Sequence, residues 1–589
     1  MTIAGVPATA LAAEFGTPLF VLDDEDFRAR CRSFHDAFPR ALFAVKAFPA
    51  RTLIRGAMSE GLGLLVATGG ELQACLRAGA DPSLIALHGN SKSEYELEMA
   101  VASGVGLLMV DNEDELEALS RIAQRHGAVQ DILLRIALGV EVETHSYLQT
   151  GGLGAKFGIS NTGDRALTAV KKAHSLPGVR LRGIHAHLGS QLTSLEPYLL
   201  EVERLFDLLL EVRNALEIEF DVLDLGGGFG VTYTDEVPVA AADAAERILL
   251  AVRVAADARR LAVPEVVVEP GRALVANTVV TLYSVGYMKD VPPATTYVAV
   301  DGGASDNIRP ALLGARYTVA PASPPRAAET ATMTVVGRHC DSGDILARDV
   351  PLPEDLRSGD LLACAATGAY GYAMASNYNK VGRPAVVAVG GGRARLILRR
   401  EDDADLGRLE VDREEEPVPT PPPGVTVRPA RPRDAAAFHR AWREITADGW
   451  VRSPEVSDPV RHYRRLFKAS STGQGLWLVA VADKAGKQVV GHLAITREAH
   501  PATEHVASLG LGVVREWRGK GIGSALMAEA LLWARSVGVQ KVTLMVYPDN
   551  PAAIRLYRKF GFVEEGRLRN HSRREYRLHD EILMGRWLD

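Results

Sequence analysis

The strongest constraint on the fold is an alternation, between residues 24 and 270, of short apolar β-type runs with longer helical stretches. Such alternation predicts parallel strands, because each helix carries the chain back to the starting edge of the sheet. Seven or eight of these units in about 250 residues are the pattern of a (β/α)₈ barrel, the α/β fold that we expect here. The apolar runs are 62–67, 85–88, 106–110, 132–136, 181–187, 222–225 and 266–269.

The rest of the chain divides at changes of composition. Beyond residue 270 the helical pattern fades into β-rich sequence with Gly and Pro turns, which predicts a separate β domain over residues 271–400. Nine acidic residues lie between 401 and 416, and a proline-rich stretch follows. Charge opposes burial and proline favours extended backbone, so residues 401–424 are predicted to be a semi-rigid linker. Ordered periodicity then resumes, which predicts a further domain over residues 425–589.

Length and composition limit the class of protein. The chain has 589 residues, 47% of them hydrophobic, which is enough for several packed cores. It contains no unbroken apolar run of about 18 residues, and its first residues lack the basic region and apolar core of a secretory signal. We therefore expect a soluble, cytoplasmic protein. Its four cysteines are too widely spaced for a disulfide framework or a zinc site, so we expect reduced thiols and no metal.

The net charge of −6 hides an uneven distribution. Residues 426–589 carry 27 Lys and Arg against 17 Asp and Glu, whereas the first 425 residues carry 40 against 56. A basic domain attracts polyanions, which include both nucleic acids and polyphosphate cofactors. No aromatic and basic nucleic-acid motif accompanies this domain. We therefore favour a polyphosphate cofactor and expect no nucleic-acid partner.

One lysine stands directly after an apolar β-type run, in Phe43-Ala44-Val45-Lys46-Ala47-Phe48. We expect its amine to be crowded by low-dielectric surroundings, which disfavour the charged form. A neutral amine is the form that condenses with an aldehyde such as that of pyridoxal phosphate (PLP). Lys46 is therefore a candidate Schiff-base former. From these six residues alone, a solvated lysine at the end of a strand is the alternative.

Polar and glycine-rich motifs follow Lys46 in a definite order. They are Gly69-Gly70-Glu71-Leu72, His88-Gly89-Asn90-Ser91-Lys92-Ser93, His185-Ala186-His187-Leu188-Gly189-Ser190-Gln191, Asp224-Leu225-Gly226-Gly227-Gly228-Phe229, Glu269-Pro270-Gly271-Arg272, Asp301-Gly302-Gly303, Asp306-Asn307-Ile308-Arg309-Pro310, Cys340-Asp341-Ser342-Gly343-Asp344, Gly368-Ala369-Tyr370-Gly371 and Ser376-Asn377-Tyr378-Asn379. This series closely resembles the diaminopimelate decarboxylases, in the alanine racemase-like group of PLP enzymes that also holds ornithine decarboxylase. The resemblance covers about residues 15 to 400 and implies that residues 1–23 join the β domain.

The resemblance implies a role for each matched position. Lys46 forms the Schiff base, and Glu269 faces the pyridine nitrogen, where a carboxylate keeps the ring protonated as an electron sink. His187 stacks on the ring. The phosphate is held through hydroxyl and backbone N–H donors by Ser190, Gly228, Gly271 and Arg272. A satisfied core histidine and an ordinary glycine turn are the alternatives for single members of this set.

Two further matches concern a second subunit. Cys340 matches the family cysteine that reaches the active site of the partner and helps to protonate the product carbanion. Taken alone, it would be a buried structural thiol. Tyr370 matches a residue that approaches the cofactor phosphate and the substrate from the rim or from the partner. The resemblance thus implies a homodimer with shared active sites.

Substrate choice depends on Arg272 and Arg309, which correspond to family residues that grip the distal carboxylate of diaminopimelate. Paired guanidinium groups suit a carboxylate and repel an ammonium group. The chain departs from the family at three positions, because Leu313 replaces tyrosine, Asp341 of the substrate site replaces glutamate, and Leu65 replaces aspartate. The expected substrate is meso-diaminopimelate, converted to L-lysine. A longer or differently substituted amino acid of a specialised pathway is the alternative.

The C-terminal domain carries a second pattern. Residues 477–482, 489–496 and 506–513 read as successive strands, with a turn at 484–487 between the first two. The third runs into a glycine-rich loop that opens a helix and presents backbone N–H groups to a phosphate. This loop resembles the acetyl-CoA loop of GNAT acetyltransferases, with Arg518, Gly521 and Gly523 at the pattern positions.

A second signature, from Asn550 to Phe562, resembles the helix and strand that follow in that family. It implies that Asn550 contacts acetyl-CoA and that Tyr557 protonates the departing thiolate. Tyr557 as a core aromatic is the alternative. Glu504 is a candidate general base acting through water, and an exposed surface carboxylate is the alternative.

Together the two patterns predict a bifunctional enzyme, a PLP-dependent amino-acid decarboxylase joined to an acetyl-CoA-dependent N-acetyltransferase. The amine that the barrel releases, or its immediate precursor, is the expected acetyl acceptor. One rival keeps the decarboxylase but changes its substrate to another carboxylate-bearing amino acid. Another treats the C-terminal domain as a non-catalytic sensor of acetyl-CoA or an amino acid.

Overall fold

The computed structural model describes residues 1–140, 156–293, 295–324, 329–410, 419–447, 449, 458–469, 474–483, 488–574 and 577–588. The chain forms two compact units, Met1–Leu409 and Glu410–Asp589. The expected turn at 484–487 lies outside the described residues.

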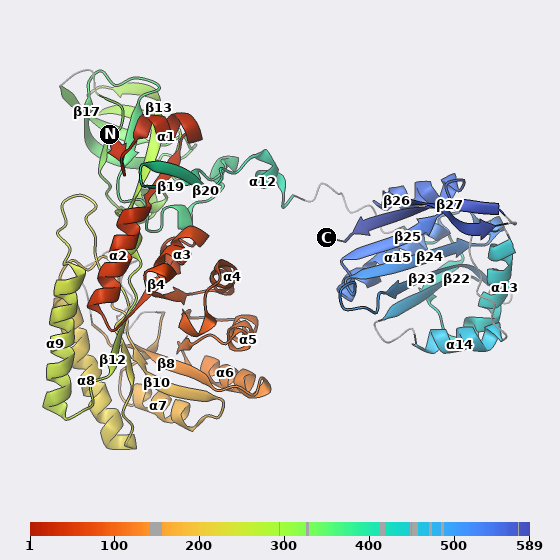
Figure 1. The fold of residues 1–589 in the computed structure, drawn as a ribbon, viewed down its shortest axis with the longest axis horizontal. Coiled ribbons are helices and arrows are strands. Elements are labelled where there is room, and N and C mark those ends of the chain that lie inside the picture. Colours follow the sequence, from red (N-terminus) through yellow and green to blue (C-terminus); the bar gives the residue numbers. More distant parts are fainter. Residues whose placement is uncertain are drawn as a thin grey trace. The chain divides into compact units, whose positions relative to one another are not determined.

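The centre of the first unit is a closed barrel. Among the described residues, eight parallel strands form a continuous sheet, and the pairing of β8 with β10 closes the ring. This arrangement confirms the predicted barrel (Figure 1). The strands are β4 (Arg40–Ala44), β5 (Gly63–Val66), β6 (Ile85–Leu87), β7 (Leu107–Val110), β8 (Gln130–Ala137), β10 (Val179–His185), β11 (Val222–Asp224) and β12 (Glu265–Val268).

Side chains of successive strand residues point to opposite faces of the barrel wall. Leu42 and Ala44 of β4 belong to a small cluster that fills the barrel interior. Phe43 between them points outward, and its ring lies 5.9 Å from that of Phe27. Because both faces are buried, β5, β6 and β7 are apolar throughout rather than alternating, whereas β8 and β10 also carry charged residues.

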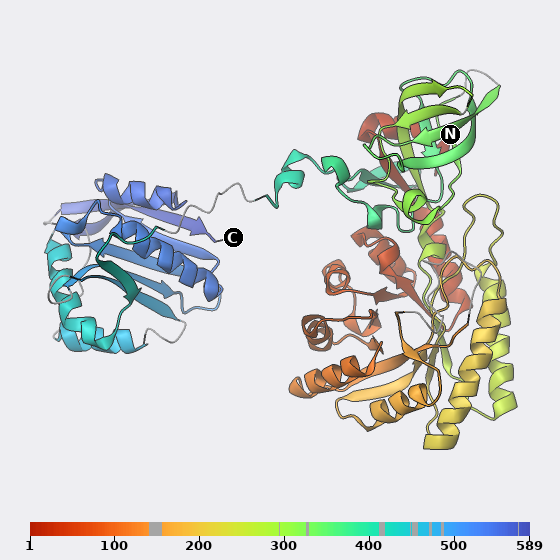
Figure 2. The same ribbon diagram turned by 180° about the vertical axis from the view of Figure 1, so that it is seen from behind.

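Helices surround the barrel wall, as Figures 1 and 2 show from opposite sides. Several begin at residues suited to the start of a helix; Ser93 forms a capping box with Glu96, and Asn112 accepts from the backbone N–H of Glu115. The helices are α2 (Asp24–Ala37), α3 (Arg51–Ser59), α4 (Gly69–Ala78), α5 (Glu94–Ser103), α6 (Glu113–Arg125), α7 (Arg165–Ser175), α8 (Glu196–Leu216) and α9 (Ala241–Arg259).

A second, mostly antiparallel sheet follows the barrel. Its path is β17 (Ile345–Pro353), β16 (Thr330–Val336), β14 (Thr295–Val300), β13 (Val279–Val291), β3 (Leu19–Asp23), β19 (Ala385–Gly390) and β20 (Arg393–Leu398), with β15 (Val319–Pro321) and β18 (Leu361–Cys364) beside it. Strand β3 lies between β13 and β19, so the N-terminal residues join this β domain.

The first unit extends past residue 400, where the sequence predicts the start of a linker. Glu401 bonds to Arg383 at 2.8 Å and accepts from Asn377 at 2.6 Å. The short helix α12 (Asp403–Gly407) follows, with its own capping box from Asp402. Part of the acidic segment is therefore held on the first unit, because its carboxylates find basic and amide partners there.

The second unit is a seven-stranded sheet among the described residues, in the order β21 (Val425–Pro429), β22 (Gly475–Ala482), β23 (Gln488–Arg497), β24 (Val506–Val513), β25 (Lys541–Val546), β27 (Arg577–Trp587) and β26 (Val563–Arg574). Helices α13 (Ala435–Ala447), α14 (Pro459–Ala469), α15 (Ile522–Ser536) and α16 (Pro551–Lys559) complete it.

Two separate cores lie on the two faces of this sheet. Leu478 and Ala480 pack with Leu526 of α15, whereas Val479 and Val481 pack with residues of α13 and α14. The sheet is thus covered on both sides, and the predicted strands of this domain are all present.

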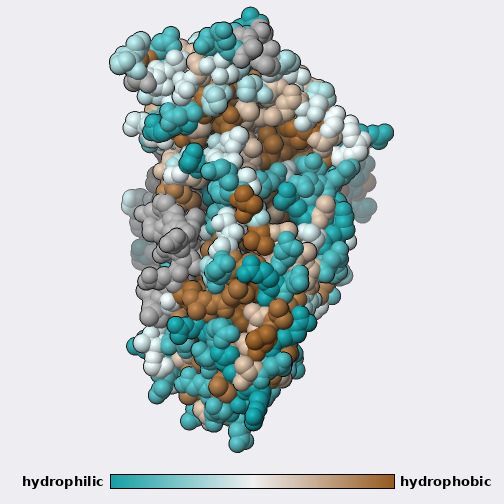
Figure 3. All heavy atoms as spheres, turned by 90° about the vertical axis from the view of Figure 1, so that its left-hand side faces the viewer, coloured by the Kyte–Doolittle hydropathy of each residue, from teal (hydrophilic) through white to brown (hydrophobic). Residues whose placement is uncertain are grey.

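Hydrophobic side chains also reach the surface of the first unit. Figure 3 shows one face of the molecule, on which they gather in patches between hydrophilic regions. The exposed residues include Leu200 of α8 and Leu250 and Val254 of α9. Among the described residues, no helix is both long and apolar enough to span a membrane.

Candidate active site

A cavity of about 250 Å³ opens at the carboxyl ends of the barrel strands, which is where such barrels place their chemistry. Nine residues that the sequence analysis singled out for PLP or substrate line it. They are Lys46, His187, Ser190, Gly228, Glu269, Gly271, Arg272, Arg309 and Tyr370. Leu65 and Leu313, where the chain departs from the family pattern, line the same cavity.

Lys46 is exposed rather than buried, and the expectation of a crowded amine was wrong. Strand β4 ends at Ala44, and the chain turns into a 3₁₀ helix at Val45–Ala47. The two flanking residues are buried, while the lysine between them extends into the cavity. Its backbone is fixed in part by Tyr370, whose N–H donates to the carbonyl of Ala47 at 3.0 Å.

The glycines beside the cavity fit a bound phosphate. Gly228 has a φ of +103°, and a Cβ there would lie 2.7 Å from the carbonyl oxygen of Gly189. A Cβ on Gly227 would lie 2.3 Å from the carbonyl oxygen of Glu269. Only glycine allows the strand ends to approach so closely, which leaves backbone rather than side chains facing the cavity. Tyr198, which the sequence analysis missed, donates to the Gly227 carbonyl at 2.9 Å and steadies this turn.

His187 presents an uncharged ring to the cavity. The N–H of Gly227 donates to its Nδ1 at 3.2 Å, so the ring proton is on Nε2. Burial holds the pKa of His187 well below its usual range. A neutral aromatic ring at this position suits stacking on a pyridine ring.

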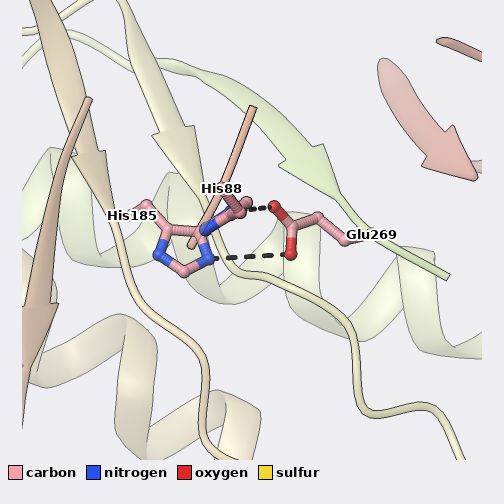
Figure 4. Close-up of side chains that lie close together, drawn as sticks. All are labelled: His88, His185 and Glu269. Atoms are coloured by element: carbon pink, nitrogen blue, oxygen red, sulfur yellow. Dashed lines mark hydrogen bonds and ion pairs between the residues drawn. The ribbon is translucent and has the colours of Figure 1, made fainter. Parts of the chain in front are cut away.

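Glu269 lies at the end of β12 between two histidines. His88 Nε2 is 2.7 Å from Glu269 Oε1, and His185 Nε2 is 3.6 Å from Oε2. Figure 4 shows both imidazole rings directed at this carboxylate. Although burial raises the pKa of Glu269, the two imidazoles outweigh it and hold the pKa well below its usual range. A carboxylate that stays ionised is the group that a protonated pyridine nitrogen requires.

Two buried arginines lie beside the same cavity without an acidic partner among the described residues. Arg272 and Arg309 are 4% and 3% exposed. Arg272 donates to the Ser190 hydroxyl at 2.8 Å. Both guanidinium groups donate to the hydroxyl of Tyr233, and Arg309 also donates to Tyr317 at 2.8 Å. Burying uncompensated cations is costly, so this arrangement is suited to an incoming carboxylate.

Like Tyr198, the two tyrosines that contact these arginines were missed by sequence reasoning. Tyr233 lies in the loop after β11, and Tyr317 lies in the segment after α11 (Arg309–Leu313). No local pattern marks either, because each meets the arginines only through the fold. The Tyr317 hydroxyl accepts a hydrogen bond from Arg309, whereas Leu313, at the position where the family pattern has tyrosine, carries no hydroxyl.

The structure does not bring Cys340 and Asp341 into this cavity. Both are exposed on the loop after β16, where the backbone N–H of Cys340 donates to Asn379 and Asp341 accepts from Gly343. Their expected place in the site of a second subunit stays a prediction. The exposed state of Cys340 differs from the buried structural thiol that a lone cysteine suggests.

A larger cavity of about 970 Å³ lies in the second unit. Strands β24 and β25 are parallel and pair through Val506–Ser508 and Lys541–Thr543. Beyond these residues the described parts of β24 and β25 are not paired with each other, and both strands line the cavity. The opening between the strands therefore gives the cavity access to both faces of the sheet.

The predicted acetyl-CoA loop forms one end of this cavity. Arg518, Gly521 and Gly523 all line it. Gly521 has a φ of +85° and precedes α15, a fifteen-residue helix without a side-chain cap at its first turn. Uncapped N–H groups and the positive end of the helix suit the phosphates of acetyl-CoA. Arg518 Nε donates to the Val513 carbonyl at 3.0 Å, which fixes the loop to the end of β24.

Asn550 and Tyr557 also line this cavity, from α16. The side chain of Asn550 caps the helix by accepting from the Ala553 N–H at 3.1 Å, so it has a structural task as well. Tyr557 is buried and belongs to the core of the unit. Burial raises its pKa to about 12, which keeps the phenol protonated as a donor to a thiolate needs to be.

Glu504 does not line the cavity. It lies exposed in the turn before β24, and its carbonyl accepts from Arg497. The acidic residues that do line it, among those described, are Glu498 and Glu581. Glu581 is 3% exposed, and its neighbour Ile582 pairs with Val546 of β25. Sequence reasoning missed both glutamates because neither belongs to a motif.

Comparison with known proteins finds a matching family for a segment of each unit. Residues 24–276 match the family of pyridoxal-dependent decarboxylases, pyridoxal binding domain, and residues 440–562 match the acetyltransferase (GNAT) family. The diaminopimelate decarboxylase of Mycobacterium tuberculosis is 46% identical over 421 residues, which are 69% of this chain and 94% of that protein. That of Bacillus subtilis is 42% identical over 418 residues, 70% of this chain and 95% of that protein.

A solved structure shows the same similarity for the first unit. The crystal structure of diaminopimelate decarboxylase from M. jannaschii in complex with L-lysine matches with a TM-score of 0.65 and 31% identity. The match covers 69% of this chain and 95% of that one. These proteins resemble the first unit at nearly their full length.

Proposed function

The chain belongs to the diaminopimelate decarboxylase family, and from this premise we propose that it is a bifunctional enzyme, a PLP-dependent decarboxylase of meso-diaminopimelate or a related amino acid joined to an N-acetyltransferase. The observation that carries the decarboxylase half is the cavity in which Lys46, Glu269 and two uncompensated arginines meet. When bound, PLP supplies an aldehyde for the amine and a protonated ring that accepts the electron pair freed as carbon dioxide leaves.

The residues of the chain bind, orient and move protons around that group. The Lys46 amine is the attachment point, Glu269 holds the proton on the ring nitrogen, and His187 supports the face of the ring. Ser190 and the glycine backbone receive the phosphate. Arg272 and Arg309 bind the distal carboxylate, which fixes the substrate by its far end and places its reacting end near Lys46.

The substrate is a carboxylate-bearing amino acid, with meso-diaminopimelate as the leading candidate and L-lysine as its product. One observation favours a relative of that substrate. Leu65 and Leu313 both line the cavity, where the family pattern has aspartate and tyrosine. Two apolar side chains in place of polar ones would suit a longer or conjugated amino acid.

We also propose a homodimer with shared sites. Cys340 is exposed and lies outside the cavity of its own chain. Three exposed hydrophobic side chains accompany these residues: Met374 lines the cavity, Tyr378 precedes the Asn379 that accepts from the Cys340 N–H, and Leu312 precedes the cavity residue Leu313. A second copy that covers them would bury this apolar surface and bring the partner subunit's Cys340 to the cavity.

Subunit mixing tests this arrangement. We expect Lys46→Ala and Cys340→Ala proteins, each nearly inactive, to regain activity when mixed under conditions of subunit exchange. A heterodimer with shared sites contains one wild-type site, so random mixing should restore about a quarter of wild-type activity. Decarboxylation assays before and after exchange measure this. Exchange shown by differently tagged chains, without any recovery of activity, would contradict sites built across the subunit boundary.

For the second unit we propose acetyl transfer to the amine that the first unit releases. Its open cavity carries Arg518 at the loop end, while Ser508 of β24, Met545 of β25, and Leu583 and Glu581 of β27 line it as well. A carboxylate and aliphatic side chains suit an aliphatic ammonium group. The undecarboxylated amino acid brings a further carboxylate toward Glu498 and Glu581, which disfavours it.

An acceptor panel tests the coupled reaction. Using full-length Lys46→Ala protein, which cannot decarboxylate, we expect acetyl transfer to L-lysine with a kcat/KM at least about tenfold above that for meso-diaminopimelate, the scale of one charge-assisted contact. Release of CoA and mass spectrometry of products measure it. Binding of acetyl-CoA by calorimetry without turnover of any amine would instead support a sensor domain. Preference for unrelated amines would leave two independent activities.

A further inference from the structure

Beyond holding the pKa of Glu269 low, the motif that begins at His88 has no role in the function derived so far, and neither has His185. Both histidines are buried, at 8% and 0% exposure, and come from two different strand ends of the barrel. Their rings lie 4.4 Å apart, centre to centre, at 69°. Both converge on the carboxylate of Glu269, His88 on one oxygen and His185 on the other (Figure 4).

The two histidines lie behind Glu269 rather than in the cavity. Of the described residues that line the cavity, Glu269 is one, whereas neither histidine is. His88 Nε2 lies 2.7 Å from Glu269 Oε1, a normal hydrogen-bond distance, and an ionised carboxylate only accepts, so this nitrogen carries the proton. At 3.6 Å His185 is too distant for a hydrogen bond, and both its ring nitrogens are buried without a hydrogen-bond partner.

The charge of the group is concentrated on Glu269. Burial lowers the pKa of His88 to about 3, so it is an uncharged donor at neutral pH. Burial, with the charge of Glu269 as a second cause, raises the pKa of Asp224 and of Glu201 well above the usual range of a carboxyl. These acids stay protonated next to Glu269. Glu269 therefore keeps the negative charge at the cavity, and the buried cation Arg135 interacts favourably with it.

We propose that His88 is a positioning residue for the cofactor, whose Nε2–H holds the Glu269 carboxylate toward the ring nitrogen while His185 closes the other side of that carboxylate to water. This inference builds on the proposed decarboxylase. His88 touches neither cofactor nor substrate and acts through Glu269. A carboxylate left to rotate or to hydrate would interact less strongly with the ring nitrogen, as is found when the outer partners of functional ligands are removed.

The same three side chains have donor atoms within 4.8 Å of one another, a spacing that a metal ion could bridge. Two arguments favour positioning over metal binding. Glu269 is the carboxylate of the cavity, and a cation on it would compete with a protonated ring nitrogen. His88 already lies at hydrogen-bond distance from the carboxylate, which leaves no room for an ion between those two atoms.

The test compares His88→Leu, which removes the donor, with His88→Gln, whose side-chain amide places an N–H close to the position of Nε2. Each protein is reconstituted with PLP labelled with ¹⁵N in the ring. We expect His88→Leu to raise the dissociation constant of PLP by roughly 10-fold to 100-fold. The ¹⁵N shift should move toward that of an unprotonated ring. His88→Gln should restore both values to near those of the wild type.

His126→Leu is the matched control, because His126 forms an exposed pair with Glu98 at 3.1 Å, away from the cavity. It should leave the PLP affinity and the ¹⁵N shift unchanged. If His88→Leu does not fold, His88→Asn, whose amide is too short to reach Glu269, should show the same loss relative to His88→Gln. An unchanged ¹⁵N shift in the donor-free variant, or a stoichiometric metal ion in the wild type, would overturn the proposal. Failure of the wild type to bind PLP would overturn the decarboxylase assignment as well.

Discussion

Replacing Lys46 with alanine should remove the covalent attachment of PLP and lower decarboxylation by on the order of 10³-fold or more, the scale of losing a covalent catalytic group. The reason is the composition of the cavity. Of the described residues that line it, Lys46 is the only one with a primary amine. The absorbance of protein-bound PLP should disappear, and borohydride reduction of the wild type should leave the pyridoxyl group on Lys46, as peptide mass spectrometry would show.

Two variants separate covalent chemistry from charge. Lys46→Arg keeps a cation in the cavity but cannot form a Schiff base, so it should be as inactive as the alanine variant. Lys156→Ala removes an exposed lysine outside the cavity and should keep wild-type activity. A pyridoxyl group found on any lysine other than Lys46 after reduction would overturn the assignment.

The barrel was predictable because its strands are buried on both faces. Apolar β-type runs such as 106–110 and 132–136 stand out against the helical stretches, and the structure places β7 and β8 over them. The motif residues follow these runs directly. Parallel strands all end on one rim, so residues from Lys46 to Glu269 meet there without any information on packing.

What the sequence could not supply is the environment of single side chains. Lys46 looks buried because its neighbours are apolar, yet the turn into a 3₁₀ helix sends it into the cavity. Tyr233 meets Arg272 across 39 positions of the chain, through a loop without a recognisable pattern. Cys340 is exposed and does not line the cavity of its own chain, which its sequence neighbourhood does not indicate. Such features are set by tertiary contacts, and sequence periodicity does not report them.

In the second unit, too, the residues of a motif were predictable, whereas the surroundings of single side chains were not. The glycine loop was predictable because it requires particular residues, as the positive φ at Gly521 shows. The acidic residue at the cavity was not, since Glu581 is 3% exposed on β27 and its burial depends on the strands around it. Glu504, chosen as a residue of the strand before the glycine-rich loop, lies instead in the turn that precedes β24 and does not line the cavity.

Removing the guanidinium group of Arg309 should change substrate choice as well as rate. Arg309 is 3% exposed and is held by the hydroxyls of Tyr233 and Tyr317, so its position is fixed before substrate binds. A substrate with a distal carboxylate exchanges its hydration for this preformed cation. In Arg309→Ala that carboxylate would be buried beside Arg272 alone. A substrate without the distal carboxylate has no such charge to leave unpaired.

For meso-diaminopimelate we expect kcat/KM to fall about 30-fold to several thousand-fold. This corresponds to roughly 2 to 5 kcal/mol of lost transition-state stabilisation, the cost of unpairing a desolvated charge. For L-lysine, which lacks that carboxylate, kcat/KM should fall by less than about tenfold in the same variant, because no buried pair is broken. The kcat/KM of Arg309→Lys for meso-diaminopimelate should lie between the values of the wild type and the alanine variant, since lysine keeps the charge but not the forked geometry.

Arg383→Ala is the control for the loss of any arginine, because it breaks a partly exposed pair with Glu401. It should leave the ratio of kcat/KM for the two substrates unchanged. Equal losses for both substrates in Arg309→Ala would show that this arginine supports the fold of the site and does not read the distal carboxylate.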